Sequence, residues 1–221
     1  MKTILICGSS GNIGSYLFKN LKSKYHVIGT SNSQNSNYLQ INLLDKKNIK
    51  KSLSNLDGLD TLIFTVGLAH SKGKNEEYKK FEEINLLTLE NIFFSLRELN
   101  KLPKKIIFTS TISVYGEKEE TNFYYEKDMP SPKSPYAITK LKAEKFLLDN
   151  YPQNCWILRL SPVYSDSFNL NLKRRISLGC LFFKIGDGNK QLTLCNIKNI
   201  NTVVESIITD LAPSGIYNIS D

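Results

Sequence analysis

The sequence predicts an α/β fold built on a doubly wound parallel sheet, with a small lobe at its C-terminal end. Three observations lead to this prediction. Short apolar runs rich in β-branched residues alternate with longer segments that have helical periodicity. The runs are almost continuously apolar, as expected of strands that are buried on both faces of a sheet. A glycine-rich turn follows the first run directly and opens the first helical segment.

Strands and helices are expected to alternate as far as residue 160. The apolar runs predict strands at residues 3–7, 26–30, 61–65, 105–109 and 155–160. Between them, helices are expected at residues 12–24, 45–53, 76–99 and 135–150. This alternation is typical of a parallel sheet whose helices cross over from one strand to the next.

Beyond residue 160 the pattern becomes looser. It predicts a short basic helix around residues 172–178, a glycine turn at 186–189, a strand near 192–195, a helix at 199–209 and a last strand at 215–220. We expect this tail to form a short lobe on the carboxyl edge of the sheet.

Composition and length indicate one globular domain in the cytoplasm. The chain has 221 residues, of which 41% are hydrophobic and 23% charged, enough for a substantial core. The apolar run at residues 4–7 is too short for a secretion signal, and no run reaches the roughly 18 residues of a membrane span. Neither CxxC nor Cys/His ligand spacing occurs, so reduced buried thiols are expected and no metal site: Cys7, Cys155, Cys180 and Cys195.

The net charge of +8 points to no nucleic-acid partner, because the lysines are scattered along the chain. A nucleic-acid surface would favour a clustered basic stripe. The same charge would suit an anionic substrate or loose attraction to an anionic membrane surface.

The stretch GSSGNIG places glycines at positions 8, 11 and 14, directly after the first predicted strand. Glycine lets the turn close tightly and the backbone approach a pyrophosphate, and the next helix directs its N-terminal amides at that charge. We therefore predict a dinucleotide site with contacts from Gly8, Ser10, Gly11, Asn12, Ile13 and Gly14.

The end of the second strand bears on the choice of cofactor. Ser31 stands where an acidic residue would hold the ribose hydroxyls of NAD. Without that acid nothing repels a 2′-phosphate, which favours NADP slightly, although no arginine is present to grip the phosphate. Both NADP and NAD stay open.

The stretch SPYAITK carries Tyr136 and Lys140 four residues apart, on one face of a predicted helix. Ser134 is a suitable N-cap and Pro135 suits the first helical position. An ordinary surface pair is the alternative. Hydroxyls gather at the end of the preceding strand, where doubly wound folds bind ligands: Thr109, Ser110, Thr111 and Ser113.

These motifs, in this order, resemble the extended short-chain dehydrogenase/reductase superfamily, and more narrowly its nucleotide-sugar epimerases, dehydratases and reductases. The resemblance covers nearly the whole chain: GSSGNIG, TSTISVYGE, PKSPYAITKLKAEKFL, ILRLSPVY, KIGDGNKQLTLCNIKNI and GIYNISD. It is strongest with 4-epimerases and 4-reductases of UDP-N-acetylhexosamines used in surface polysaccharides. The resemblance implies a Rossmann domain at residues 1–160 and a short substrate lobe at 161–221, interleaved with the last strands.

The resemblance also implies catalytic roles for Thr111, Tyr136 and Lys140. Tyr136 would move a proton to or from the sugar, and Thr111 would hydrogen-bond the reacting oxygen. An ordinary tyrosine has a pKa near ~10, too high for a base at neutral pH. The Lys140 ammonium, helped by the positive nicotinamide, is expected to lower that pKa. Lys140 would also hold the cofactor ribose.

Further contacts follow from the same resemblance. Tyr136 and Lys140 would touch the cofactor, together with Asn42, Leu43, Thr65, Val66, Gly67, Asn85, Pro162 and Val163. Substrate contacts are expected from Thr111, Ser113 and Lys190. A homodimer is expected through the long helix and the active-site helix, using Phe93, Phe94 and Phe146.

Two features depart from the family pattern. Leu192 takes the place of an arginine that contacts the diphosphate, and the sequence ends at Asp221, soon after the last predicted strand. The main prediction is an NAD(P)-dependent epimerase or oxidoreductase acting on a nucleotide sugar, in surface polysaccharide or lipopolysaccharide biosynthesis. Alternatives are an NADPH-dependent 4-keto-sugar reductase, a dinucleotide-binding sensor or scaffold without turnover and, on charge alone, an RNA-binding derivative of the fold.

Overall fold

A computed structural model describes the chain except for residues 36, 70–76, 117–122, 170–176, 179–180 and 183–192. In the described part, seven parallel strands form one sheet in the order β11-β6-β5-β4-β1-β2-β3. They are β1 (Thr3–Cys7), β2 (His26–Ser31), β3 (Leu39–Gln40), β4 (Thr61–Phe64), β5 (Lys105–Thr111), β6 (Cys155–Leu160) and β11 (Gly215–Ile219). The predicted doubly wound sheet is confirmed.

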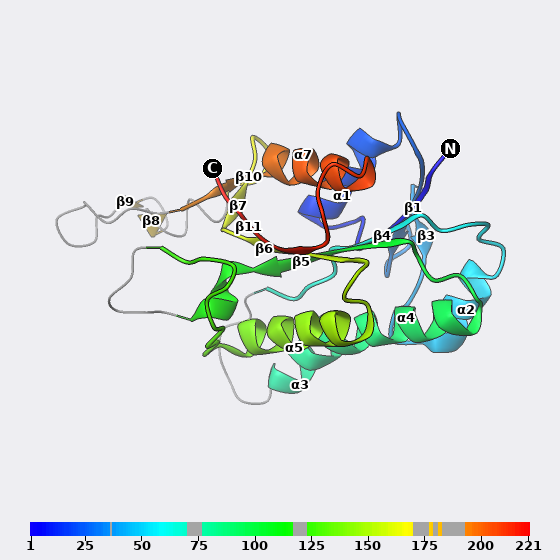
Figure 1. Cartoon of the computed structure of the whole chain (residues 1–221), viewed down its shortest axis with the longest axis horizontal. Coiled ribbons are helices and arrows are strands. Elements are labelled where there is room, and N and C mark those ends of the chain that lie inside the picture. The colour runs from blue at the N-terminus through cyan, green and yellow to red at the C-terminus, as the bar shows by residue number, and fades with distance from the viewer. Residues whose placement is uncertain (36, 70–76, 117–122, 170–176, 179–180, 183–192) are drawn as a thin grey trace.

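Helices cover both faces of the sheet (Figure 1). One face carries α1 (Asn12–Leu21) and α7 (Ile197–Ile208). The other carries α2 (Lys46–Leu53), α3 (Glu77–Glu82), α4 (Thr88–Glu98) and α5 (Pro135–Asn150). A π-helical segment, η1 (Glu83–Leu87), joins α3 to α4, so the long helix predicted at residues 76–99 is wider at its centre than a regular α-helix.

The strands are buried on both faces because each face packs on a separate layer of helices. Along β1, Ile4 and Ile6 point into the core beneath α1 and α7, whereas Leu5 and Cys7 point into the core beneath α2, α4 and α5. Successive side chains of a strand alternate between faces. A strand that serves two cores must therefore be apolar throughout, as the sequence is.

The C-terminal part contributes to the main body. Strand β11 pairs with β6 at the edge of the sheet, and α7 packs on the core that α1 also covers. Shorter strands lie outside the sheet: β7 (Val163–Tyr164) pairs with β10 (Cys195–Asn196), and β8 (Ser177–Leu178) pairs with β9 (Leu181–Phe182). The short helix predicted around residues 172–178 is wrong at residues 177–178, which form strand β8 by backbone pairing with β9. The rest of that prediction lies outside the described residues. The division at residue 160 stays a prediction.

Among the described residues, no helix has the length and apolar character needed to cross a membrane. The three cysteines that the structure describes are buried and unpaired: Cys7, Cys155 and Cys195.

Candidate active site

Most of the predicted site residues lie at one edge of the sheet, after the carboxyl ends of five strands. The glycine turn follows β1, Ser31 ends β2, Thr65 follows β4 and Thr111 ends β5. Pro162 follows β6. The strand order reverses between β1 and β4, and ligands of this fold bind in the crevice at such a reversal. The topology therefore gathers the predicted cofactor and catalytic residues at the expected place.

Two positions of the segment after β1, 8 and 14, have room for glycine only. Gly8 has a φ of +91°, a conformation that other residues rarely adopt. A Cβ atom on Gly14 would lie 2.3 Å from the Gly8 carbonyl oxygen and 2.8 Å from Thr65 Oγ1. Thr65 Oγ1 in turn donates to the Cys7 carbonyl at 2.9 Å. The start of α1 is thus pressed against the ends of β1 and β4.

The first turn of α1 suits a pyrophosphate. Its N-cap residue, Gly11, has extended backbone and supplies no side-chain cap, so that the first amides of the helix are left for another acceptor. Gly11, Asn12 and Ser10 are exposed. The close-packed glycines and uncapped amides together fit the phosphates of a dinucleotide.

The adenosine end of the predicted site carries neutral groups. Ser31 is buried, and its Oγ lies 3.2 Å from Ser33 Oγ. Asn42 is exposed, and its side-chain oxygen accepts from the Leu44 amide at 3.0 Å, which stabilises the turn before α2. Leu43 is buried. An aspartate at position 42 could make the same turn, so the asparagine changes the charge while the local backbone is kept.

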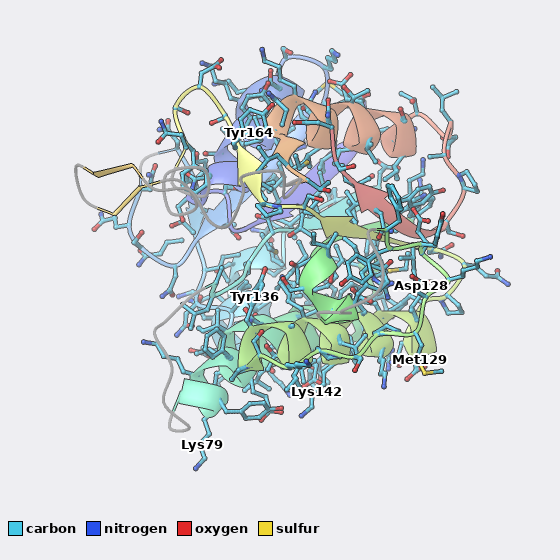
Figure 2. All side chains as sticks on the ribbon, turned by 90° about the vertical axis from the view of Figure 1, so that its left-hand side faces the viewer. Lys79, Asp128, Met129, Tyr136, Lys142 and Tyr164 are labelled. Atoms are coloured by element: carbon cyan, nitrogen blue, oxygen red, sulfur yellow. The ribbon has the colours of Figure 1, made fainter. Side chains whose placement is uncertain are left out.

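Tyr136 lies at the start of α5, which begins as predicted. The Ser134 side chain accepts from the Ala137 amide at 3.2 Å, and Pro135 opens the helix. Tyr136 is half-buried, and its hydroxyl forms a hydrogen bond with Thr111. Figure 2 shows Tyr136 toward the interior and Lys142 on the outer side of the same helix.

Burial raises the pKa of Tyr136 to about 12, and the hydrogen bond with Thr111 opposes this only in part. The pKa of Tyr136 is therefore raised in the protein without cofactor, and its lowering by Lys140 together with a bound nicotinamide stays a prediction. The sequence showed that Lys140 is close, but it did not show how much water the fold removes from the phenol.

Lys140 is almost fully buried, with 2% of its surface exposed. Its Nζ donates to the Thr109 carbonyl at 2.8 Å and to the Val66 carbonyl at 3.3 Å, and lies 4.5 Å from the centre of the Phe108 ring. Burial lowers the pKa of Lys140 to about 7, against an opposing effect of Glu144. A Cβ atom on Gly67 would approach Lys140 Nζ to 3.2 Å, which explains a glycine there.

Asn85 joins the site from the π-helical segment. It is fully buried, its side-chain oxygen accepts from the Leu68 amide at 2.7 Å, and its side-chain nitrogen donates to Thr139 Oγ1 at 3.0 Å. Asn85 therefore connects the loop after β4 to the residue before Lys140. π-Helical turns are frequent at functional sites because they redirect a side chain.

A model of the NAD dependent epimerase/dehydratase family matches residues 4–219. The chain belongs to this family. The prediction of an NAD(P)-dependent enzyme of the extended short-chain dehydrogenase type is confirmed at the level of the family. None of the curated proteins compared with the chain matches it.

Solved structures of the epimerase/dehydratase fold resemble the chain over its whole length. The UDP-N-acetylglucosamine 4-epimerase from Bacillus cereus has 20% identity and a TM-score of 0.77, with 100% of this chain and 78% of that chain covered. The UDP-glucose 4-epimerase from Thermus thermophilus, in complex with NAD, has 22% identity and a TM-score of 0.80, with 99% and 77% covered. RMD from Pseudomonas aeruginosa, in complex with NADPH, has 18% identity and a TM-score of 0.75, with 100% and 78% covered.

The remaining predicted contact residues differ in their burial and in their contacts. Ser113 is exposed next to Thr111, whose hydroxyl lies 3.2 Å from Ser113 Oγ. The Pro162 carbonyl accepts from the Cys195 amide at 3.1 Å, and Val163 is buried. Lys190, the predicted substrate contact, and Leu192 lie outside the described residues.

One buried ion pair that was not predicted from the sequence lies beside the candidate active-site residues. Glu144 and Arg159 are both buried, and Glu144 lies one helical turn after Lys140. The signal was available, since an arginine in an apolar strand is buried only when it is paired.

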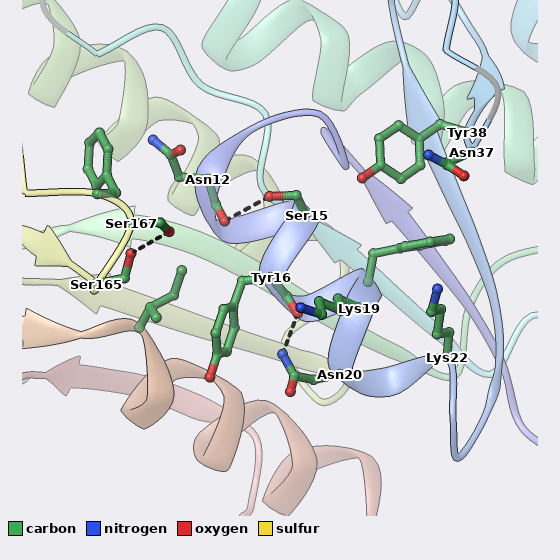
Figure 3. Close-up of a pocket in the computed structure, with 13 residues that line it drawn as sticks. Asn12, Ser15, Tyr16, Lys19, Asn20, Lys22, Asn37, Tyr38, Ser165 and Ser167 are labelled. Carbon is green, nitrogen blue, oxygen red and sulfur yellow. Dashed lines mark hydrogen bonds between the residues drawn. The ribbon is translucent and has the colours of Figure 1, made fainter.

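A hollow of about 540 Å³ runs along the outer face of α1 (Figure 3). Its walls include Asn12, Ser15 and Lys19 of α1 together with Tyr38, Ser165 and Ser167. Thr111, Tyr136 and Lys140 do not line it. The candidate active site is therefore defined by the carboxyl edge of the sheet and not by this hollow.

The substitution Lys140→Met is expected to change how stability depends on pH. The folded pKa is about 7 and the ordinary value is 10.5, so unfolding takes up a proton between these values. The free energy of unfolding of the wild type should rise with pH across that window, while Lys140→Met lacks this rise. We expect the free energy of unfolding of Lys140→Met, minus that of the wild type, to fall by about 1 to 3 kcal/mol between about pH 6.5 and 9.5.

Urea denaturation at both pH values measures this difference. Lys142→Met is the control, because Lys142 lies exposed on the same helix. If the difference in unfolding free energy between Lys140→Met and the wild type is the same at both pH values, the lowered pKa of Lys140 is contradicted.

Proposed function

We propose that the protein is an NAD(P)-dependent epimerase or oxidoreductase that acts on a nucleotide-activated sugar. The observation that supports it best is the hydrogen bond between Thr111 and Tyr136. It lies at the same sheet edge as the glycine turn, beside the buried Lys140. Two of the similar structures are, by their names, 4-epimerases of UDP-sugars. The sequence resemblance extends the proposal to surface polysaccharide or lipopolysaccharide biosynthesis.

In the proposed reaction, each residue of the site would have a separate role in cofactor binding or proton transfer. The glycine turn and the start of α1 would hold the pyrophosphate, and Lys140 would hold the ribose next to the nicotinamide. A bound NAD(P) supplies an acceptor or donor of hydride. As a phenolate, favoured by the Lys140 ammonium and the positive nicotinamide, Tyr136 Oη would take the proton of a sugar hydroxyl, and as a phenol it would return a proton to a carbonyl. Thr111 Oγ1 would hold the reacting oxygen.

A second candidate is the reduction of a 4-keto sugar with NADPH. Ser31, a neutral residue at the cofactor-specifying position, and a similar structure in complex with NADPH favour it.

Incubation with a panel of UDP- and dTDP-sugars distinguishes the candidates. An epimerase converts a sugar to its 4-epimer, detected by proton NMR, without net oxidation of NADH or NADPH. A reductase consumes NADPH with a 4-keto sugar. Cofactor binding without turnover of any sugar in the panel would favour a sensor or scaffold, and failure to bind either dinucleotide would refute the proposal.

The cofactor preference follows from Ser31. We expect NADPH to bind at least as tightly as NADH in a fluorescence titration, because no carboxylate at the end of β2 repels the 2′-phosphate. The matched variant Ser31→Asp should shift the preference toward NADH. A wild-type preference for NADH of tenfold or more, about 1.4 kcal/mol, would contradict this expectation.

We also propose a homodimer through the outer face of η1, α4 and α5. There Phe94 is 46% exposed and Leu87 39% exposed, beside a hollow of about 250 Å³ that Phe93 and Phe146 also line. Light scattering at micromolar concentration should give the mass of two chains. Phe94→Glu should give a monomer, whereas Leu211→Glu, at another exposed apolar residue, should not. A monomeric wild type would refute the proposal.

A further inference from the structure

A buried ion pair connects α5 to β6 immediately behind the candidate active site. The side chains of Arg159 and Glu144 are 3% and 1% exposed. Arg159 Nη2 donates to Glu144 Oε2 at 2.7 Å, and Arg159 Nε lies 3.2 Å from both carboxylate oxygens. Apolar residues of similar volume often replace such a buried pair without loss of stability, although removal of one partner alone is costly. Its presence next to the site therefore calls for a functional explanation.

The carboxylate of the pair holds the strand that carries Thr111. Ser110 Oγ donates a short hydrogen bond to Glu144 Oε1. Ser110 also lies opposite Arg159 in the register of β5 and β6. Since Ser110 directly precedes Thr111, the pair fixes the end of β5 relative to α5, the helix that carries Tyr136.

The guanidinium of the pair holds the segment that leads to α5. It lies 4.7 Å from the centre of the Tyr115 ring, and Arg159 Nη1 donates to the Glu126 carbonyl at 3.4 Å. Tyr115 Oη donates to Asn218 Oδ1 at 2.8 Å, and the Asn218 amide donates to Glu126 Oε1 at 2.9 Å. Arg159 is thus the centre of a network that joins β11, the turn after β5 and the approach to Tyr136.

The same carboxylate faces Lys140 from the next turn of α5. The other groups around Lys140 are the phenol of Tyr136 on the same helix, the carbonyls of Thr109 and Val66, and the ring of Phe108. On the side of β6 the charged group is Arg159, which is bound to Glu144. Glu144 therefore supplies the negative charge that favours the ammonium form of Lys140 in a buried environment.

We propose that Glu144 and Arg159 are positioning residues for the site: together they fix Thr111 relative to Tyr136, and the carboxylate places a negative charge one helical turn from Lys140. This inference rests on the proposed function, in which the Lys140 ammonium binds the cofactor ribose. Neither residue touches the reacting atoms. Their effect acts through Ser110, the segment before α5 and the charge of Lys140.

The test is the pH dependence of NADH and NADPH affinity, measured by fluorescence titration between about pH 5.5 and 9.5. Wild-type affinity should fall as Lys140 loses its proton, and Lys140→Met should bind weakly with no such fall. Glu144→Gln keeps a hydrogen-bonding oxygen for Ser110 but removes the charge. We expect Glu144→Gln to lower the pH at which dinucleotide affinity falls by about half a pH unit or more, because Lys140 loses a nearby negative charge.

A single substitution leaves Arg159 buried without its carboxylate, so Glu144→Gln can fail to fold. The double variant Glu144→Gln/Arg159→Met removes both charges and should recover thermal stability. It should nevertheless retain a smaller shift to lower pH, because the loss of the positive Arg159 only partly offsets the loss of the nearer negative charge of Glu144. The control Glu82→Gln removes a carboxylate that binds α5 at its surface, through Lys142 at 2.7 Å, and should shift nothing.

The outcomes separate this inference from the proposed function. If the wild type binds neither dinucleotide at any pH, the proposed function fails. If it binds with a pH dependence that Lys140→Met removes, but the double variant is stable and keeps the wild-type pH profile, the pair is only structural and the inference is overturned. A wild-type affinity that does not change with pH overturns it as well.

Discussion

Tyr136→Phe is expected to lower turnover of the sugar substrate by about 10²- to 10⁴-fold, the usual loss when a positioned proton-transfer group is removed. The ring stays in place, so the fold and the affinity for the cofactor should change little. The substitution deletes only the hydroxyl that is bound to Thr111. Turnover with an identified nucleotide sugar and NADH titration measure the two effects separately.

The matched control is Tyr125→Phe, since Tyr125 is 59% exposed and precedes α5 on the same connecting segment. Its turnover should stay within about twofold of the wild type. Thr111→Ser should be tolerated, whereas Thr111→Ala should lower turnover less than Tyr136→Phe does, because it removes a hydrogen bond and not a proton carrier. Full activity of Tyr136→Phe would show that the tyrosine is structural.

Gly14→Ala is expected to lower the affinity for NADH and NADPH by more than about tenfold. Inside a helix alanine is ordinarily better than glycine by about 1 kcal/mol. Here the added Cβ would lie 2.3 Å from the Gly8 carbonyl oxygen, so α1 must move away from the end of β1. That movement withdraws the first amides of α1 from the pyrophosphate.

Gly58→Ala is the control for this substitution. Gly58 has open space around its Cβ position but a φ of +56°, so alanine there should cost about 1 kcal/mol of stability and leave cofactor affinity unchanged. Thermal unfolding and fluorescence titration distinguish the two variants. Wild-type affinity in a folded Gly14→Ala protein would show that the turn after β1 does not hold the cofactor.

The sequence was sufficient for features that depend on neighbouring residues. Alternating apolar runs and helical segments predicted β1, β2, β4, β5 and β6, because a strand between two cores must be apolar at every position. The short edge strand β3 was not predicted, since both of its residues are exposed. Ser134 and Pro135 predicted the start of α5. The ordered motifs of the whole chain also indicated the family, whose model matches residues 4–219.

Only the tertiary structure decided features that depend on burial and on contacts between distant residues. The sequence placed Tyr136 and Lys140 one turn apart and predicted that Lys140, together with a bound nicotinamide, lowers the phenol pKa. The fold desolvates both groups, and burial opposes the charged form of each, so the pKa of Tyr136 rises and that of Lys140 falls. No spacing along one helix contains that information.

The supporting contacts have the same origin. Asn85 reaches Leu68 and Thr139 because a π-helical turn directs it between β4 and α5, and Arg159 meets Glu144 because β6 packs against that helix. The sequence by itself therefore determined the fold, the family and the candidate groups. The packing of α5 on β5 and β6 determined their electrostatic state, because charge in a protein interior depends on the water excluded and on the partners brought within a few ångströms.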